Sequence, residues 1–86
     1  MSQNYANLYT DENSQGLQGT KIISFPWPAK RISITNYSSN QELKWRFKAG
    51  HPWATLDPLE TVAMDVSVKQ LTLESVGATY KMWALG

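Results

Sequence analysis

The sequence of 86 residues contains no cysteine, which excludes a disulfide framework and any metal site built on thiolates. It also contains no run of about 18 apolar residues, the length that a membrane-spanning helix needs. Its charges nearly balance, with eight Lys and Arg against seven Asp and Glu. A dedicated nucleic-acid protein usually shows a basic stripe, so neither nucleic acid nor a membrane is an expected partner.

The first 20 residues are mostly polar and show little periodicity. They have no basic segment followed by an apolar one, so no signal peptide is expected. We interpret residues 1–20 as an extended N-terminal arm and residues 21–86 as one β-sandwich domain. A domain this small buries only roughly 60% of its unfolded surface and often needs disulfides, metals or association. Self-association is therefore expected.

Alternation of apolar and polar side chains predicts β-strands along the rest of the chain. The clearest case is residues 42–48, where Leu43, Trp45 and Phe47 face one way and the charged side chains face the other. No stretch of ten or more residues keeps helical spacing. The predicted fold class is all-β, a small antiparallel sandwich or barrel of about six or seven short strands. The other predicted strands are residues 20–25, 31–36, 53–56, 61–66, 69–75 and 79–85.

Turn residues separate these predicted strands. Pro26 and Pro28 cannot donate to a strand ladder, so they predict a corner or sheet edge around Trp27. Loops or turns are expected at residues 37–41, 49–52, 57–60 and 76–78.

Residues 42–61 hold the only histidine and several carboxylates, which raises the question of catalysis. His51 has no nucleophile motif and no orienting partner near it in the sequence. Asp57 and Glu60 flank Pro58, which is typical of a turn rather than of an acid and base pair. Residues 10–13 lack the spaced ligands of a calcium loop. We therefore predict no catalytic, cofactor-binding or metal-ligating residue, and no enzyme activity.

Aromatic side chains are better candidates for contacts. Trp27 and Trp53 lie at predicted corners, and Trp83 lies opposite Tyr80 and Met82 on a final strand with two apolar faces. Interface centres are enriched in Trp and Tyr, and such rings also stack on sugars. The residues predicted to bind a partner are Tyr5, Leu8, Tyr9, Trp27, Trp53 and Trp83. Substitution of Trp83 by Ser is expected to impair self-association.

Residues 30–86 resemble small β-sandwich structural proteins of tailed bacteriophages. The similarity lies in an I-x-N strand end, an L-x-W-x-F strand, a W-x-x-L step, a D-V-x-x-K-x-L-x-L strand and a closing Y-K-M-W-A-L-G. Leu59 departs from the pattern, because it replaces a turn glycine. The matching residues are Ile34, Asn36, Leu43, Trp45, Phe47, Trp53, Leu56, Glu60, Asp65, Val66, Lys69, Leu71, Leu73, Tyr80, Met82, Trp83 and Gly86.

The resemblance implies a non-enzymatic virion protein, made in the host cytoplasm and located on the capsid surface. A capsid decoration or cement protein is the leading expectation, acting as a homotrimer that binds the major capsid protein. A neck or tail accessory protein, or a fibre protein, is the alternative within this class. A small carbohydrate-binding module is the alternative outside it. The resemblance implies no catalytic residue and no cofactor.

Overall fold

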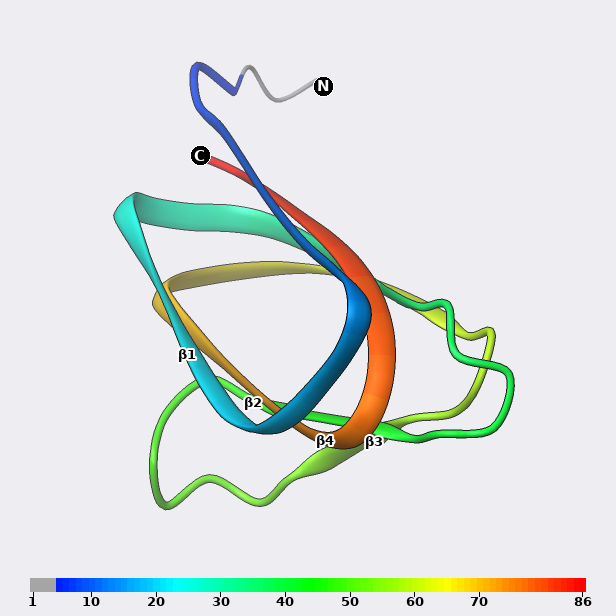
Figure 1. Ribbon diagram of the computed structural model, residues 1–86. Helices are drawn as coiled ribbons and strands as arrows, with labels where there is room; N and C mark the ends of the chain where they lie inside the picture. Colours follow the sequence, from blue (N-terminus) through cyan, green and yellow to red (C-terminus); the bar gives the residue numbers. More distant parts are fainter. Residues whose placement is uncertain (1–4) are drawn as a thin grey trace.

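A computed structural model describes residues 5–86, and within this range the chain contains strands and loops but no helix. Two strands are long, β1 (Leu8–Asn36) and β4 (Thr61–Leu85), and two are short, β2 (Leu43–Arg46) and β3 (Ala54–Leu56). All pair antiparallel, in the order β1-β4-β2-β3 (Figure 1). The predicted all-β antiparallel class is confirmed. The predicted six or seven short strands merge, because β1 and β4 run on through corners.

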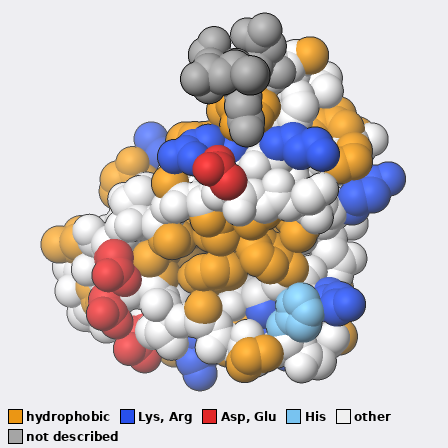
Figure 2. Space-filling view, turned by 180° about the vertical axis from the view of Figure 1, so that it is seen from behind, with side chains coloured by type: hydrophobic (Ala, Val, Ile, Leu, Met, Phe, Trp, Pro, Cys, Tyr) orange, Lys and Arg blue, Asp and Glu red, His pale blue; other side chains and the backbone are white. Residues whose placement is uncertain are grey.

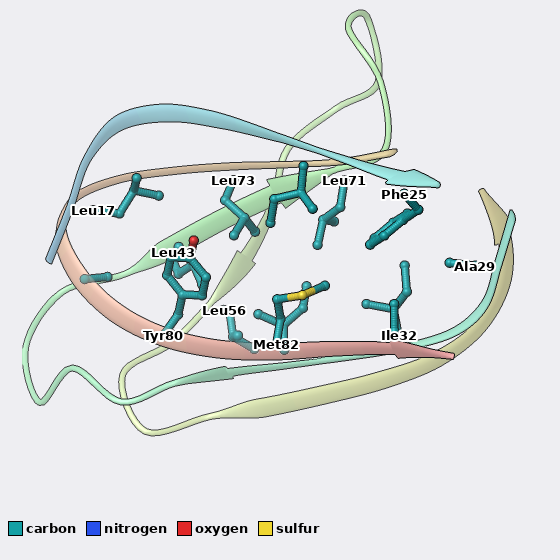
Figure 3. Close-up of a cluster of buried hydrophobic side chains, with 14 residues drawn as sticks. Leu17, Phe25, Ala29, Ile32, Leu43, Leu56, Leu71, Leu73, Tyr80 and Met82 are labelled. Atoms are coloured by element: carbon teal, nitrogen blue, oxygen red, sulfur yellow. The ribbon is translucent and has the colours of Figure 1, made fainter. Parts of the chain in front are cut away.

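The two long strands bend so that one hydrogen-bonded sheet folds into two layers, which pack face to face (Figures 1 and 3). Layer one contains, in order, residues 8–13, 80–85, 29–36 and 61–68. Layer two contains, in order, residues 17–24, 70–78, β2 and β3. This interleaved order is that of a double-sheet jelly roll.

Prolines and glycines mark the places where β1 and β4 change layer. Pairing with β4 stops at Ser24 and resumes at Ala29, and the prolines predicted to interrupt a strand lie between them. At another corner Gly16 and Gly77 both have positive φ angles, 105° and 122°. A Cβ on Gly16 would lie 2.8 Å from the carbonyl oxygen of Gly77, so only glycine permits this approach. The predicted turn at residues 76–78 is therefore an irregularity inside β4.

The hydrophobic core fills the space between the two layers, where side chains from both point toward each other (Figure 3). Leu43, Leu71 and Leu73 from layer two are fully buried, as are Ile32 and Ile34 from layer one. The predicted alternation of the final strand is confirmed. Its inward side chains, Tyr80, Met82 and Ala84, are buried, whereas Lys81, Trp83 and Leu85 face outward.

The prediction of an N-terminal arm is wrong from Leu8 onward. Residues 8–13 pair with 80–85, and Leu17 lies in the core at 6% exposure. Just before β1, the amides of Ala6 and Asn7 both donate to the carbonyl of Gly86. Sequence reasoning missed this segment because backbone hydrogen bonds hold it, while few of its side chains are apolar. Residues 1–4 of the predicted arm lie outside the described residues.

Candidate functional site

The edge segments of the two layers face each other along two lines on the surface. We call these lines the closed seam and the open seam. The closed seam lies between the edge segments 8–13 and 17–24, which belong to β1. The open seam lies between residues 61–68 of β4 and residues 43–56, which form β2, β3 and the loop between them. The two seams differ in the chemistry of their inward side chains.

Polar and aromatic contacts span the closed seam. The Lys21 ammonium and the Tyr80 hydroxyl both donate to Asp11 Oδ2, at 2.9 and 2.7 Å. Burial, and then the hydrogen bond to Asp11, raise the pKa of Tyr80 above its ordinary value of 10.0. The rings of Tyr9 and Phe25 pack edge to face with their centroids 5.4 Å apart. This seam is therefore sealed by side chains of the same chain.

A second polar cluster joins the layers at the side chain of Asn36, which is fully buried. Its amide donates to the carbonyls of Gln41, at 2.8 Å, and Leu56, at 3.1 Å. Its carbonyl accepts a hydrogen bond from the Ser38 amide at 2.9 Å. These contacts fix the loop after β1 and satisfy a buried polar group, so this cluster is structural.

The open seam carries partly exposed hydrophobic side chains and no comparable polar link. Within the described chain, no side-chain hydrogen bond or ion pair joins residues 61–68 to residues 43–56. Figure 2 shows hydrophobic side chains gathered in the middle of the face that also carries the histidine. The partly exposed hydrophobic residues of this seam are Trp45, Phe47, Val62, Met64, Val66 and Val68.

The backbone at the open seam is also unpaired on one side. Segment 61–68 pairs only with 29–36 among the described residues. The backbone amide of Asn36 donates to the Glu60 carbonyl at 2.9 Å, so residues 36 and 60 form a hydrogen-bonded pair. This pair fixes which residues of the two segments bond to each other and which point away. Residues 62 and 64 then bond to β1, and the backbone groups of 61, 63 and 65 point to the free edge. A second chain could pair with them.

A groove of about 460 Å³ lies at one end of the open seam, where β4 passes between layers. Phe47 and Val68 supply its apolar surface, and Lys48, His51 and Lys69 line it as well. No carboxylate is among its lining residues. In Figure 2, basic side chains flank the histidine, and acidic side chains lie at the opposite side of the same face.

The residues that first raised the question of catalysis lie in a loop and in a turn. His51 is exposed in the loop between β2 and β3, and its carbonyl accepts a hydrogen bond from Arg46. Across a turn, the Asp57 backbone amide donates to the Glu60 carboxylate at 2.9 Å, and the Glu60 backbone amide donates to the Asp57 carbonyl at 3.1 Å. No group of three or more His, Cys, Asp or Glu within residues 5–86 is placed to hold a metal ion.

The predicted partner-binding residues are spread over the molecule. Tyr9 and Trp27 come together at the closed seam, where both rings contact Phe25. Trp53 lies beneath the guanidinium of Arg46, 4.1 Å from its carbon. Trp83 lies on the outer face of layer one, and Leu8 is 65% exposed on the edge segment of that layer. Tyr5 precedes β1. Their role in binding stays a prediction.

Sequence reasoning did not identify the open seam, although it predicted an alternating strand at 61–66, which carries Val62, Met64 and Val66 on one face. They do point inward, but they are only partly buried, because β3 opposite them has just three residues. The sequence feature that could have indicated this seam was the short spacing between the two predicted turns, 49–52 and 57–60, on either side of β3. A strand this short cannot cover eight residues of the opposite layer.

No family model and no curated protein matches the chain, but solved structures do. The cupin-2 domain of an XRE-family transcriptional regulator from Enterobacter cloacae is 15% identical, with a TM-score of 0.54 over 91% of this chain and 77% of that one. The Drosophila melanogaster CENP-C cupin domain is 6% identical, with a TM-score of 0.49 over 100% and 65%. The Staphylococcus aureus capsular polysaccharide assembling protein CapF is 14% identical, with a TM-score of 0.47 over 98% and 25%.

The first of these similarities establishes a cupin-like jelly-roll fold. It also corrects the expected bacteriophage family, because this similar structure is the cupin-2 domain of a transcriptional regulator and not a virion protein. The predicted capsid decoration, cement, neck, tail and fibre functions depended on that family and are wrong, and the predicted location on a capsid is not supported. Seven of the 17 matching residues, among them Leu43, Leu71 and Leu73, are buried hydrophobic core positions. Any antiparallel sandwich needs such alternation, so the motif indicated the architecture alone.

Proposed function

We propose that this jelly-roll domain is a non-enzymatic interaction module that self-associates through its open seam. The observation that carries the proposal is the edge segment 61–68, whose inward side chains are all apolar and partly exposed. An exposed edge strand with an apolar inner face is a template for pairing with another chain. The best-matched occupant is a second copy of the same segment.

The other edges of the sandwich support this assignment, because they carry features that discourage pairing. Edge segment 8–13 points Asp11 inward, and edge segment 17–24 points Lys21 inward. β3 is only three residues long. Inward charges and short edge strands are the usual protections against edge-to-edge contact. Among the edge segments, 61–68 alone is both long and free of inward charge within the described residues.

Antiparallel pairing of two identical edges places a two-fold axis between them, so each chain offers the same surface to the other. The outward backbone groups of residues 61, 63 and 65 would form the ladder. Val62, Met64 and Val66 would meet their counterparts and be removed from water. This arrangement makes a dimer, whereas the expected homotrimer would need contacts between two different surfaces.

The packed interior supports the non-enzymatic part of the proposal. Side chains from both layers fill the space between the sheets (Figure 3). A reaction site in the barrel would need a cavity with convergent polar groups. The fully buried polar residue, Asn36, already has its partners in the backbone. The fold itself is compatible with many functions, so the non-enzymatic assignment is based on these residues and not on the fold.

Sedimentation equilibrium of purified protein and two matched variants tests the proposal. The wild type is expected to exceed its monomer mass of 9.7 kDa and approach twice that value as concentration rises. Met64→Lys places a charge on the inner face of the edge, and we expect at least about a 100-fold rise in the dissociation constant. Ala63→Lys adds the same charge to the outer face of the same segment and should leave association unchanged.

The outcomes separate the open seam from the outer face of layer one. Val62→Lys serves as a second seam variant if Met64→Lys does not give a cooperative melting transition. A wild type that remains a monomer at every concentration overturns the proposal. Dissociation by Ala63→Lys, with Met64→Lys still associated, also overturns it, because Ala63 pairs with Ser33 next to Trp83 on the outer face.

A further inference from the structure

The groove at the end of the open seam combines basic and apolar side chains without any acidic one. Lys48, His51 and Lys69 line it together with Phe47 and Val68. Ligand sites are typically apolar surfaces with a few well-placed polar groups that set orientation. The composition of this groove therefore fits a ligand with an apolar body and a negative head.

The two lysines of the groove have no partners of opposite charge. The ion pairs of the described residues use Lys21, Arg31 and Lys81, and neither groove lysine takes part in one. The whole chain has a net charge of only +1, and no carboxylate lines this groove to offset its two lysines. Two ammonium groups that face the same groove repel each other, and a bound anion between them removes that repulsion.

We propose that this groove binds a small monocarboxylate with an apolar body. The carboxylate lies between Lys48 and Lys69, and the apolar body rests on Phe47 and Val68 and points along the seam toward Val66. The lining residues include neither an arginine fork nor a glycine-rich backbone nest, which are common marks of a phosphate site. The inference does not depend on self-association.

Titration of isotope-labelled wild-type protein with four probes tests this assignment by amide chemical shifts. Octanoate supplies the head and the tail, acetate the head, octylammonium the tail with the opposite charge, and inorganic phosphate an anion without a tail. We expect saturable shifts in residues 47–51 and 67–70 with octanoate. Each of the other probes should bind at these residues at least tenfold more weakly.

Variants then test the two lysines directly. The double variant with Lys48→Gln and Lys69→Gln should weaken octanoate binding at least tenfold. Lys30→Gln, which removes an exposed lysine outside the groove, should not change it. The proposal is overturned if octylammonium or phosphate binds as tightly as octanoate, if octanoate shifts other residues only, or if the double variant binds like the wild type.

Sedimentation of the same samples keeps this result separate from the proposed function. A wild type that binds octanoate as a monomer contradicts association through the seam and supports the groove. A dimer that shows no octanoate shifts in residues 47–51 and 67–70 supports association and overturns the groove.

Discussion

The two seams of the sandwich differ in how fully the side chains of this chain cover the hydrophobic core. At the closed seam, Asp11 receives hydrogen bonds from Lys21 and Tyr80, and Phe25 is only 4% exposed. At the open seam, Phe47 and Met64 remain partly exposed, and within the described residues no side-chain hydrogen bond joins residues 61–68 to residues 43–56. The self-association that we propose would cover the open seam as the side chains of this chain cover the closed one.

The lengths of the facing segments explain the difference. At the closed seam, 8–13 and 17–24 are of similar length and are joined by one corner of β1. At the open seam, 61–68 faces β3, which is much shorter. The inward side chains of 61–68 are therefore only partly buried by the described residues. Association is one way for a small domain without disulfides to bury them.

The largest expected effect comes from truncating the one phenylalanine at each seam. Phe25→Ala should lower the free energy of unfolding by about 3–5 kcal/mol, because it empties a buried site. Phe47→Ala, measured in the monomer, should cost about 1–2 kcal/mol, since that ring is only partly buried. Urea denaturation measures both, and equal losses would contradict the distinction between the seams.

A smaller effect is expected from the carboxylate of the closed seam. Asp11→Ala removes the acceptor of the buried Tyr80 hydroxyl and should cost about 1–3 kcal/mol. Asp65→Ala is the matched control, because its side chain is 71% exposed and pairs with Arg31 at the surface. That change should cost about 0–1 kcal/mol. A loss at Asp65 as large as that at Asp11 would show that the closed seam has no special role.

The pH dependence of stability offers a further comparison. Because the pKa of folded Tyr80 is raised, its contribution is fully present below its unfolded pKa of about 10 and is lost as pH rises through the folded value. Unfolding free energy should fall by up to about 1.4 kcal/mol per pH unit above pH 10 through this group. Tyr80→Phe should make that alkaline fall shallower. An unchanged slope in the variant would contradict the role of this hydroxyl.

The smallest expected effect concerns the outer face of layer one. Trp83→Ser was expected from the sequence to impair self-association, but the side chain lies away from the open seam. On the present account it should change the dissociation constant by less than about threefold, a difference of under about 0.7 kcal/mol. Light scattering over a dilution series measures this. A large rise in the dissociation constant would move the interface to the outer face.

The sequence predicted local features well, and long-range ones poorly. Alternation correctly assigned the inward side chains of 42–48 and of the final strand, and the pairing of β1 with β4 does stop around Pro26 and Pro28. These features depend on neighbouring residues. The seams depend on which distant segments become edges, and alternation is the same for edge and central strands. The pairing of 8–13 was missed for a related reason, since its partner lies at the other end of the chain.

The candidate site was largely beyond sequence reasoning. Phe25 ends one predicted strand and Phe47 ends the predicted inward face of another, yet Phe25 is covered by Tyr9 and Phe47 is not. Lys48 and Lys69 are 21 positions apart in the printed sequence and share a groove only because β4 turns beside the β2–β3 loop. Likewise, the contact between the Trp53 ring and the guanidinium of Arg46 was not predicted from the sequence.

Amide hydrogen exchange at two edges of layer one tests the central claim most directly. The outward amides of residues 61, 63 and 65 should exchange freely at low concentration and become protected as concentration rises. The backbone amides of Gly86 and Asn7 each donate to the carbonyl of the other residue. The amides of residues 8, 10 and 12 therefore point outward on the opposite edge and provide the control. They should exchange freely throughout. Protection of the control edge alone, or of neither edge in an associated sample, would contradict pairing at the open seam.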